Sequence, residues 1–324
     1  MHATKRVGLW LCAAMLGSAA LFAHAQDYPA RPIKIVIPYS PGGIADTFTR
    51  ALAQELSDRL KQPVVAENKP GGSMIIGAEA VAKAAPDGYT LFLGSIASLA
   101  INVGAFNKLP YDPQKSFAPV SMVFYTPLFL VVNLNVPAKS VKELVAYAKA
   151  HPGAVNFGSV GHGSSLHLAG ELFKSVAGID IVHVPYKGSS KVLPDLLAGR
   201  IQMEFDGGTF LKQVKAGKLR LLAVTSSKRI DSLPDTPTMV EAGIPGYEME
   251  LWFGIVAPAG TPKPVVDRLS REIAHVVKQP AFKARFVDYG VEPTSNSPEA
   301  FAELIARDID KWVKLVKDSG IKRR

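Results

Sequence analysis

The side chains best suited to nucleophilic catalysis or metal binding lie in one short segment. Ser164 and Ser165 could act as nucleophiles, with His167 as the base. Neighbours on one helical turn seldom reach each other in the geometry that this chemistry needs. His167 and Glu171 lie four residues apart on one helix face with His162 nearby, but no second cluster supplies a further metal ligand. The sequence therefore predicts no catalytic residue and no metal site, and a hydrolase-like enzyme built on these residues stays as the alternative.

Other enzyme motifs are incomplete. The segment Gly158 to Ser165 contains no G-x-S-x-G elbow, and Leu166 stands where a dinucleotide fingerprint would have its third glycine. The nearest approach to a phosphate loop, Gly217-Lys218-Leu219, has the wrong residue after the lysine. His183 at a strand end is better explained by packing or hydrogen bonding than by catalysis. We therefore predict no cofactor.

Loops rich in glycine and serine follow the predicted strands and offer a different chemistry. They are Ser40 to Asp46, Gly71 to Ser73, Gly94 to Ser98, Ser159 to Ser165 and Asp206 to Gly208. In a doubly wound sheet such strand ends share one edge, and two lobes facing each other enclose a cleft. Backbone amides and serine hydroxyls at helix N-termini would suit a carboxylate there.

The segment Ile33 to Arg50 shows this pattern most clearly. Its β-branched run predicts a strand buried on both faces, and Pro41 ends the strand. Gly42 and Gly43 can take positive φ and leave backbone amides bare. Apolar residues then recur at helical spacing from Asp46, which sits where it can cap the helix. We expect Asp46 to fix the loop rather than to touch an anion, which its charge would repel.

Strands and helices alternate along the rest of the chain, which predicts an α/β fold of two lobes, each a doubly wound and mostly parallel sheet. The lobes are predicted at 26–125 with 248–324, and at 126–247. The chain first crosses between them near Tyr125-Thr126-Pro127 and returns between Thr225 and Trp252. Two amphipathic helices, Pro264 to Lys278 and Pro298 to Ser319, should pack on the first lobe.

Residues 1–25 are typical of a secretory signal peptide. Lys5 and Arg6 precede an apolar segment, and Ala23-His24-Ala25 fits a cleavage site after Ala25. Cleavage removes Cys12, the only cysteine, and leaves 299 residues with a formal charge of +7 in place of +9. The exported chain then has no disulfide and no thiolate metal site. The basic residues are scattered, which indicates no nucleic-acid partner.

Many short motifs, each weak alone, together resemble one family. In the first half they are Tyr28-Pro29, Arg31-Pro32, Pro41-Gly42-Gly43 with Asp46, Glu67-Asn68-Lys69-Pro70-Gly71, Pro86-Asp87-Gly88-Tyr89-Thr90-Leu91 and Leu109-Pro110-Tyr111-Asp112-Pro113. Further along they are Gly158-Ser159, Gly161, Gly163-Ser164, His167 to Phe173, His183 to Gly188, Lys215 to Arg220, Ala223 to Ser226, Glu241-Ala242-Gly243 and Ala257 to Pro262. The chain resembles the Bug receptors, the extracytoplasmic solute-binding proteins of tripartite tricarboxylate transporters.

This resemblance implies a periplasmic binding protein of type II, a monomer that holds a small organic acid in the cleft between its lobes and delivers it to a membrane permease. In the family, the Pro-Gly-Gly loop holds a carboxylate through backbone amides and ordered waters. The residues expected to bind the ligand are Tyr39, Ser40, Pro41, Gly42, Gly43, Asp46, Ser95, Ser98, Ser159, Gly161, Gly163, Ser164, Ser165 and Asp206. Di- and tricarboxylates, aromatic or pyridine carboxylates, and an amino acid paired with Asp206 are the candidate ligands.

Two segments depart from the family pattern. Leu99 to Phe106 lacks the expected Asn-Pro-x-Leu-Tyr run, and Gly207 to Val214 replaces a proline-rich segment. Both are predicted to border the cleft, so they bear on the identity of the ligand and leave the fold unaffected.

Overall fold

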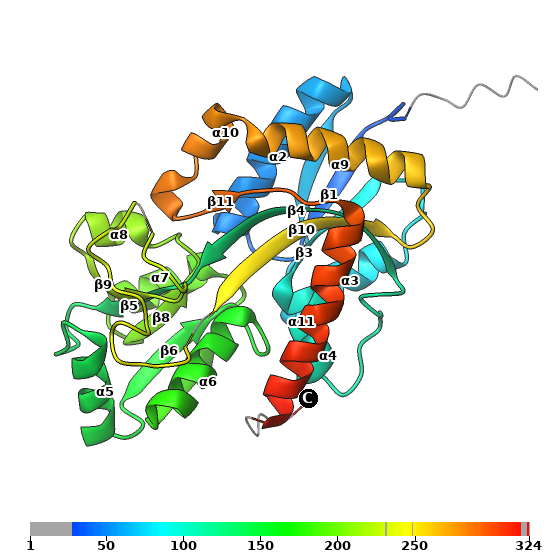
Figure 1. The fold of residues 1–324 in the computed structure, drawn as a ribbon. Coiled ribbons are helices and arrows are strands. Elements are labelled where there is room, and N and C mark those ends of the chain that lie inside the picture. Colours follow the sequence, from blue (N-terminus) through cyan, green and yellow to red (C-terminus); the bar gives the residue numbers. More distant parts are fainter. Residues whose placement is uncertain (1–27, 231, 248, 319–322, 324) are drawn as a thin grey trace, which may run out of the picture.

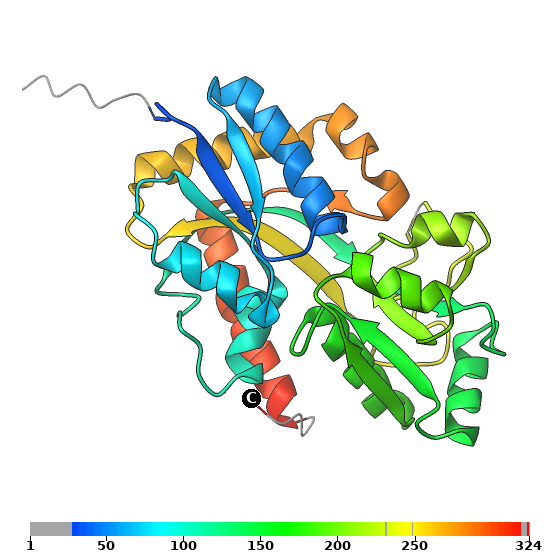
Figure 2. The ribbon, with the colours of Figure 1, turned by 180° about the vertical axis from the view of Figure 1, so that it is seen from behind.

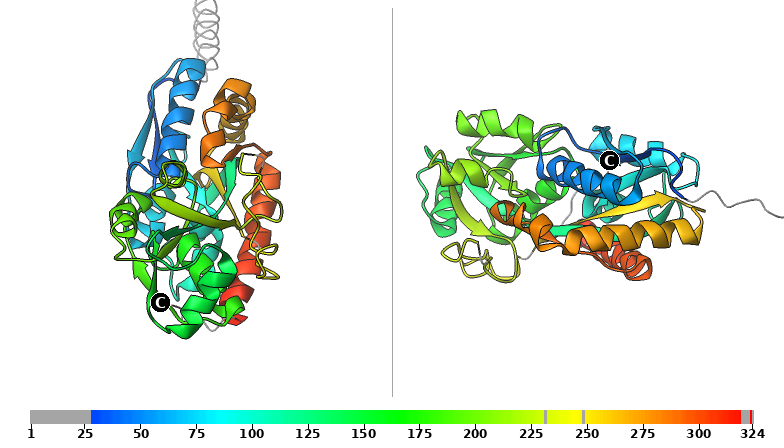
Figure 3. Two further views of the ribbon diagram at one scale, coloured as in Figure 1. Left: turned by 90° about the vertical axis from the view of Figure 1, so that its left-hand side faces the viewer. Right: turned by 90° about the horizontal axis from the view of Figure 1, so that it is seen from above.

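Two β-sheets lie at opposite ends of an elongated molecule, each with its own helices (Figures 1 and 3). The structure, a computed structural model, describes residues 28–230, 232–247, 249–318 and 323. The predicted signal peptide and its cleavage site after Ala25 lie outside these residues. Within the described ranges, no helix combines the length and the apolar character needed to cross a lipid bilayer.

The first sheet has six strands in the order β11-β4-β10-β3-β1-β2. They are β1 (Ile33–Ile37), β2 (Val64–Asn68), β3 (Thr90–Ser95), β4 (Phe117–Pro127), β10 (Glu250–Pro258) and β11 (Glu292–Pro293). The β1 strand pairs in parallel with β2 and β3, and all its residues except Lys34 are buried. This central, two-sided burial explains why its sequence is nearly continuous in β-branched residues.

The second sheet has five strands in the order β7-β6-β8-β5-β9. They are β5 (Phe129–Asn133), β6 (Val155–Ser159), β7 (Ile181–Pro185), β8 (Met203–Asp206) and β9 (Leu219–Val224). The β6 strand pairs in parallel with β7 and β8. The carboxyl ends of these three strands therefore meet at one edge, from which the following loops leave.

The α/β alternation is confirmed, but both sheets are mixed rather than mostly parallel. The β10 strand is antiparallel to β3 and β4, and β5 is antiparallel to β8 and β9. The reason is that β4 leads directly into β5 past Leu128, while β10 returns beside β4 in the opposite direction (Figure 1). A chain that crosses from one sheet to the other and comes back must pair with itself in antiparallel fashion.

Helices cover both faces of the sheets. They are α2 (Ile44–Leu60), α3 (Ile75–Ala82), α4 (Asn102–Ala105), α5 (Val141–Ala150), α6 (Ser165–Ala177), α7 (Ser189–Leu197), α8 (Leu211–Lys215), α9 (Lys263–Lys278), α10 (Pro280–Ala284) and α11 (Pro298–Asp318). Short helical turns occupy Gly72–Met74 (η2), Ala97–Ile101 (η3) and Val287–Tyr289 (η4). Around the first sheet, α2 and α9 pack together above one face, and α3 and α11 lie on the other (Figures 1 and 2).

The start of α5 is fixed by its own residues, and the predicted packing of the last two long helices on the first sheet is confirmed. The Oγ atom of Ser140 accepts a hydrogen bond from the amide of Glu143 at 3.2 Å, and the Glu143 carboxylate accepts one from the amide of Lys139 at 2.7 Å, which caps α5. The C-terminal helices α9 and α11 both pack against β4 of the first sheet. Their apolar faces are therefore buried where the sequence placed them.

Candidate ligand-binding site

A small cavity of about 40 Å³ lies between the two sheets and draws its walls from both. Its lining consists of Tyr39, Ser40, Gly43, Ile44, Ala45, Thr126, Val160, Ser165, Leu166, Gly188, Ser189, Gly207, Thr209, Leu251 and Phe253. None of these side chains carries a charge. The wall is mostly apolar with a few polar groups, which is the usual composition of a small-molecule site.

The first polar group is the N-terminus of α2. Gly42 has a φ of 90°, and Gly43 forms the N-cap without any side-chain cap. Within the described residues, the amides of Gly43, Ile44 and Ala45 have no protein hydrogen-bond acceptor. The same three residues line the cavity. Unsatisfied amides at a helix N-terminus attract an anion, because their partial positive charges point at one place.

Asp46 holds this loop from behind. One carboxylate oxygen accepts from the amide of Gly42 at 3.0 Å, and the other accepts from Arg50 at 3.0 Å and Asn68 at 2.8 Å. Burial alone would raise the pKa of Asp46, but these hydrogen bonds outweigh burial and hold it below its usual value. The expected cap is thus corrected: Gly43 caps the helix, and the Gly42 amide is bound to Asp46 instead of bare.

Tyr39 lines the cavity and contacts a pair of buried serines behind the cavity wall. Its hydroxyl lies 2.9 Å from the Oγ atom of Ser95, and its carbonyl accepts from the side chain of Asn68 at 3.0 Å. Ser95 in turn pairs with Ser98, and both are buried outside the cavity lining. Burial raises the pKa of Tyr39 to about 12, so its hydroxyl keeps its proton and can donate. The two serines therefore position Tyr39.

The second polar group is the N-terminus of α6. Ser164 caps this helix by accepting a hydrogen bond from the amide of His167 at 3.2 Å. The Oγ atom of Ser159 accepts from the amide of Gly161 at 3.1 Å. These two hydroxyls are therefore used within their own loop, while Ser165 and the neighbouring Leu166 reach the cavity.

The third polar group, the N-terminus of α7, was missed by the sequence analysis. Gly188 is its N-cap without a side-chain cap, and Gly188 and Ser189 line the cavity. A signal was present, because a strand is followed here by glycine, serines and a helix, as in the other loops. The Oγ atom of Ser40 donates to the carbonyl of Lys187 at 2.9 Å, so this loop also touches the first sheet's loop.

The end of β8 supplies another side of the cavity. A carboxylate oxygen of Asp206 accepts from the amide of Phe210 at 2.7 Å and shapes the turn that presents Gly207 and Thr209. Asp206 is fully buried behind that turn and is not part of the lining. Burial raises its pKa to about 7, against the hydrogen bonds from the turn. The departing segment Gly207 to Val214 thus borders the cavity, as predicted.

The apolar wall comes largely from the crossing strands. Leu251 and Phe253 of β10 line the cavity together with Thr126 of β4. The sequence could not identify them, because almost every residue of β10 is buried and apolar and no pattern marks the face that meets the cavity. In the other departing segment, Phe106 lines a neighbouring groove with His162 instead of this cavity.

The serine and histidine contacts do not form the arrangement suggested by the hydrolase alternative. The Nδ1 atom of His167 accepts from the amide of Gly163 at 3.0 Å, and its Nε2 atom faces Glu171 at 3.6 Å. Ser164 bonds the backbone of His167 and not its ring. Ser159 does lie 2.6 Å from His183, but Ser159 is fully buried and cannot meet a substrate where it stands.

The fourteen predicted residues therefore fall into two groups. Those that line the cavity are Tyr39, Ser40, Gly43 and Ser165. Those that lie outside its lining, in the loops around it or behind them, are Pro41, Gly42, Asp46, Ser95, Ser98, Ser159, Gly161, Gly163, Ser164 and Asp206. Three of the five predicted loops, Ser40 to Asp46, Ser159 to Ser165 and Asp206 to Gly208, contribute lining residues. The residue within each loop that faces the cavity depends on how the backbone turns.

Comparison with known proteins gives a consistent result over nearly the whole chain. The family described as tripartite tricarboxylate transporter family receptor matches residues 48–321. Protein BugT of Bordetella pertussis (strain Tohama I) is 38% identical over 318 residues, covering 98% of this chain and 97% of that protein.

Solved structures agree with this assignment. R. palustris Rpa4515 with adipate has a TM-score of 0.89 at 36% identity, and the periplasmic binding protein BugD has 0.88 at 34%; each match covers 92% of this chain and 100% of the other. MatC from Rhodopseudomonas palustris with bound malate has a TM-score of 0.84 at 30% identity, covering 89% and 100%. The two-lobed fold expected from the sequence is thereby confirmed. The chain belongs to the tripartite tricarboxylate transporter receptor family of periplasmic solute-binding proteins.

Proposed function

We propose that the protein captures a small dicarboxylate in the cavity between its sheets and delivers it to a tripartite tricarboxylate-type permease. The observation that carries this proposal is the convergence of three helix N-termini, those of α2, α6 and α7, on a cavity without charged side chains. A carboxylate can accept from amides at such ends without a neighbouring cation.

The positions of the helix ends favour two carboxylates over one. The α2 end belongs to the first sheet, and the α6 and α7 ends belong to the second. Between them lie apolar groups such as Leu251 and Phe253, which suit the methylene chain of a diacid. Two related proteins of known structure hold adipate and malate, which fit this description. A di- or tricarboxylate is therefore our first choice over an aromatic carboxylate or an amino acid.

The chemical argument for an amino-acid ligand no longer holds. It required Asp206 to pair with an ammonium group, but Asp206 is buried behind the Gly207 turn and bonded to Phe210. No other acidic side chain lines the cavity. An ammonium group placed there would meet helix N-termini, whose partial charge repels it.

Isothermal titration calorimetry of the purified chain against adipate, malate, citrate, nicotinate and glutamate tests the proposal. We expect saturable one-to-one binding that is strongest for a dicarboxylate, with NMR showing each acid recovered unchanged. Absence of binding to every acid, or turnover that Ser164→Ala abolishes, would overturn it.

Export, delivery and oligomeric state are separate parts of the proposal. N-terminal sequencing of protein secreted into the periplasm should begin at Gln26 if cleavage follows Ala25. Size-exclusion chromatography with light scattering should give the mass of a monomer. Delivery to a permease is tested by uptake of the labelled acid in cells with and without this chain.

A further inference from the structure

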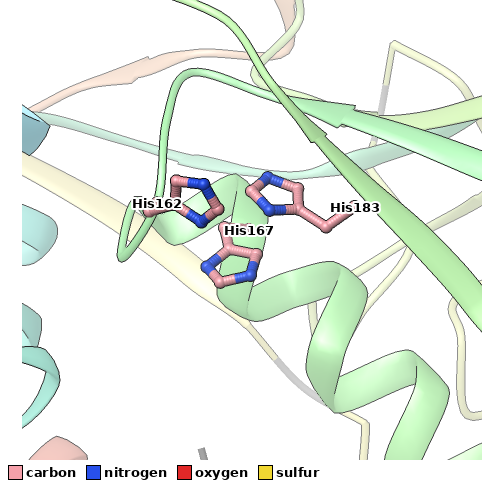
Figure 4. A group of neighbouring side chains, drawn as sticks. All are labelled: His162, His167 and His183. Carbon is pink, nitrogen blue, oxygen red and sulfur yellow. The ribbon is translucent and has the colours of Figure 1, made fainter. Parts of the chain in front are cut away.

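Three of the chain's seven histidines meet beside the second sheet. One side-chain nitrogen from each of His162, His167 and His183 lies within 4.8 Å of the others. Figure 4 shows the three rings turned toward a common space. All three side chains are partly exposed, so an ion could reach them from solvent.

Three different elements bring these histidines together. His162 lies in the loop that follows β6, His167 in the first turn of α6, and His183 in β7 (Figure 4). The parallel register of β6 and β7 sets His183 beside Phe157, on which the His183 ring packs at 5.0 Å. All three elements belong to the second sheet and its helices.

We propose that His162, His167 and His183 form a binding site for a divalent transition-metal ion, with Zn²⁺ as its natural occupant. Imidazole nitrogens are preferred ligands of zinc, and three of them with one further position form a common tetrahedral set. The fourth position goes to water, while the Glu171 carboxylate lies 3.6 Å from the Nε2 atom of His167 on the other side of that ring.

The hydrogen bonds already present suit such a site. The Nε2 atom of His183 lies 2.6 Å from the hydroxyl of Ser159, which holds the ring in place. His167 would exchange its bond from the Gly163 amide for the metal and keep its Nε2–H directed at Glu171. A carboxylate behind a ligating histidine orients the ring and makes it a better ligand.

The rings must move somewhat to coordinate. Zinc–nitrogen bonds of 2.0–2.1 Å in a tetrahedron place two nitrogens about 3.4 Å apart, so the widest pair here must close by about 1.4 Å. His162 can supply this movement, because it lies on a loop between Gly161 and Gly163, whose positive φ angles are 124° and 73°. The rings of His167 and His183, stacked with centroids 3.8 Å apart, must also separate before both can direct a nitrogen at one ion.

Simple packing is the competing explanation. His167 and His183 stack with their ring centroids 3.8 Å apart, and both lie against Phe157. Packing of this kind accounts for two rings. His162 meets both rings edge to face, with centroids 5.6 and 4.8 Å apart, which is also a favoured packing arrangement. Metal titration therefore distinguishes the two explanations.

An occupied site would also stiffen the ligand-binding loop. The carbonyl of His162 accepts a hydrogen bond from Ser73, which belongs to the first sheet's side of the cleft. The same loop leads to Ser165 and Leu166 of the cavity wall. Metal binding would therefore hold a loop that serves both the acid and the contact between lobes.

Calorimetric titration of Zn²⁺ into the untagged, chelator-treated chain tests the proposal without any carboxylate present. We expect one Zn²⁺ per chain, with His162→Asn weakening the affinity at least tenfold. His151→Asn is the matched control, since His151 is exposed at the end of α5 and should leave zinc binding unchanged. Co²⁺ in place of Zn²⁺ should give the visible absorption of a tetrahedral site in the wild type and lose it in His162→Asn.

Several outcomes would overturn the site. These are an absence of saturable zinc binding to the wild type, equal affinity in His162→Asn, or an equal loss in His151→Asn. His183→Gln gives a second test if circular dichroism shows that this variant folds. If it does not fold, His162→Asn decides alone, because His162 lies in a loop and is not part of the hydrophobic core. Since the acid is absent, failure here leaves the proposed carboxylate binding untouched, and failure to bind acids leaves the zinc result valid.

Discussion

The loops after β1 and β6 bring helix N-termini to one cavity but are held by different chemistry. Behind the first loop, the charged side chain of Asp46 bonds Gly42, Arg50 and Asn68. In the second, hydroxyls and imidazoles hold the backbone, and Ser164 caps the helix that follows. The lesson is that the shared feature is the backbone amides, whereas the side chains that hold each loop can differ.

The acidic side chains behind the cavity also differ between the two lobes in their pKa values. Asp46 has a pKa below its usual value because its hydrogen bonds outweigh its burial. Asp206 has a pKa raised to about 7 because its burial outweighs its hydrogen bonds. Nearby Glu204, whose two carboxylate oxygens have no protein partner among the described residues, has its pKa raised further by burial and by Asp206. One side thus relies on a charged acid and the other on acids that keep their protons.

Gly43→Val should produce the largest effect on binding. A Cβ atom at Gly43 meets nothing within 4 Å, and its φ of −84° suits any residue, so the fold should tolerate valine. The side chain would enter the cavity in front of the bare amides. We expect at least a hundredfold loss of dicarboxylate affinity by calorimetry, with an unfolding midpoint within a few degrees of the wild type. Unchanged affinity would remove the α2 end from the site.

Asp206→Asn should stabilise the protein above neutral pH. Between the usual carboxyl pKa of 3.8 and about 7, the native state binds more protons at Asp206 than the unfolded state. The stability contributed by Asp206 is therefore full below pH 3.8 and is lost as the pH rises toward 7. Asparagine removes this loss and can still accept from Phe210.

Urea unfolding at several pH values measures this change. We expect a gain of about 4 kcal/mol at pH 8 relative to the wild type, shrinking toward zero near pH 4. A gain that does not vary with pH would show that Asp206 is ionised in the native protein.

Asp46→Asn is the matched change on the other side, and its sign should be opposite. Asparagine loses the ion pair with Arg50 and directs an amide at either Gly42 or Asn68, which are themselves donors. We expect a loss of about 1–2 kcal/mol at pH 7 and about tenfold weaker ligand binding, because the Gly42 loop is no longer held.

The pH dependence of Asp46 runs against that of Asp206. With a lowered native pKa, its contribution is present above pH 3.8 and disappears as the pH falls through the native value. The difference between wild type and Asp46→Asn should therefore shrink in acid. Equal pH profiles for the two asparagine variants would contradict the contrast between the two sides.

Ser164→Ala should have the smallest effect. It removes the N-cap of α6, which typically costs about 1 kcal/mol. Its hydroxyl bonds the His167 amide within the loop and lies outside the cavity lining, so dicarboxylate affinity should fall by no more than about threefold. Denaturant unfolding and calorimetry on the same samples separate these effects. A large affinity loss at full stability would place the Ser164 hydroxyl in direct contact with the ligand.

Local signals allowed much of the fold to be predicted from the sequence. The β-branched run of Ile33 to Ile37 and the apolar periodicity of the last helices each depend on residues close together in the chain. The loops rich in glycine were predicted for the same reason. Antiparallel pairing of β10 was not, because it depends on the path of the chain between the lobes.

The sequence by itself predicted where the chain turns from strand into helix, because glycine, proline and serine act on the backbone of their own segment. Tertiary structure alone decided that Gly188 joins Gly43 at one cavity and that Asp206 stands behind the wall. It also decided that His183, sixteen residues beyond His167, completes a cluster of three imidazoles. Such distant contacts depend on strand order and register, which short-range patterns do not encode.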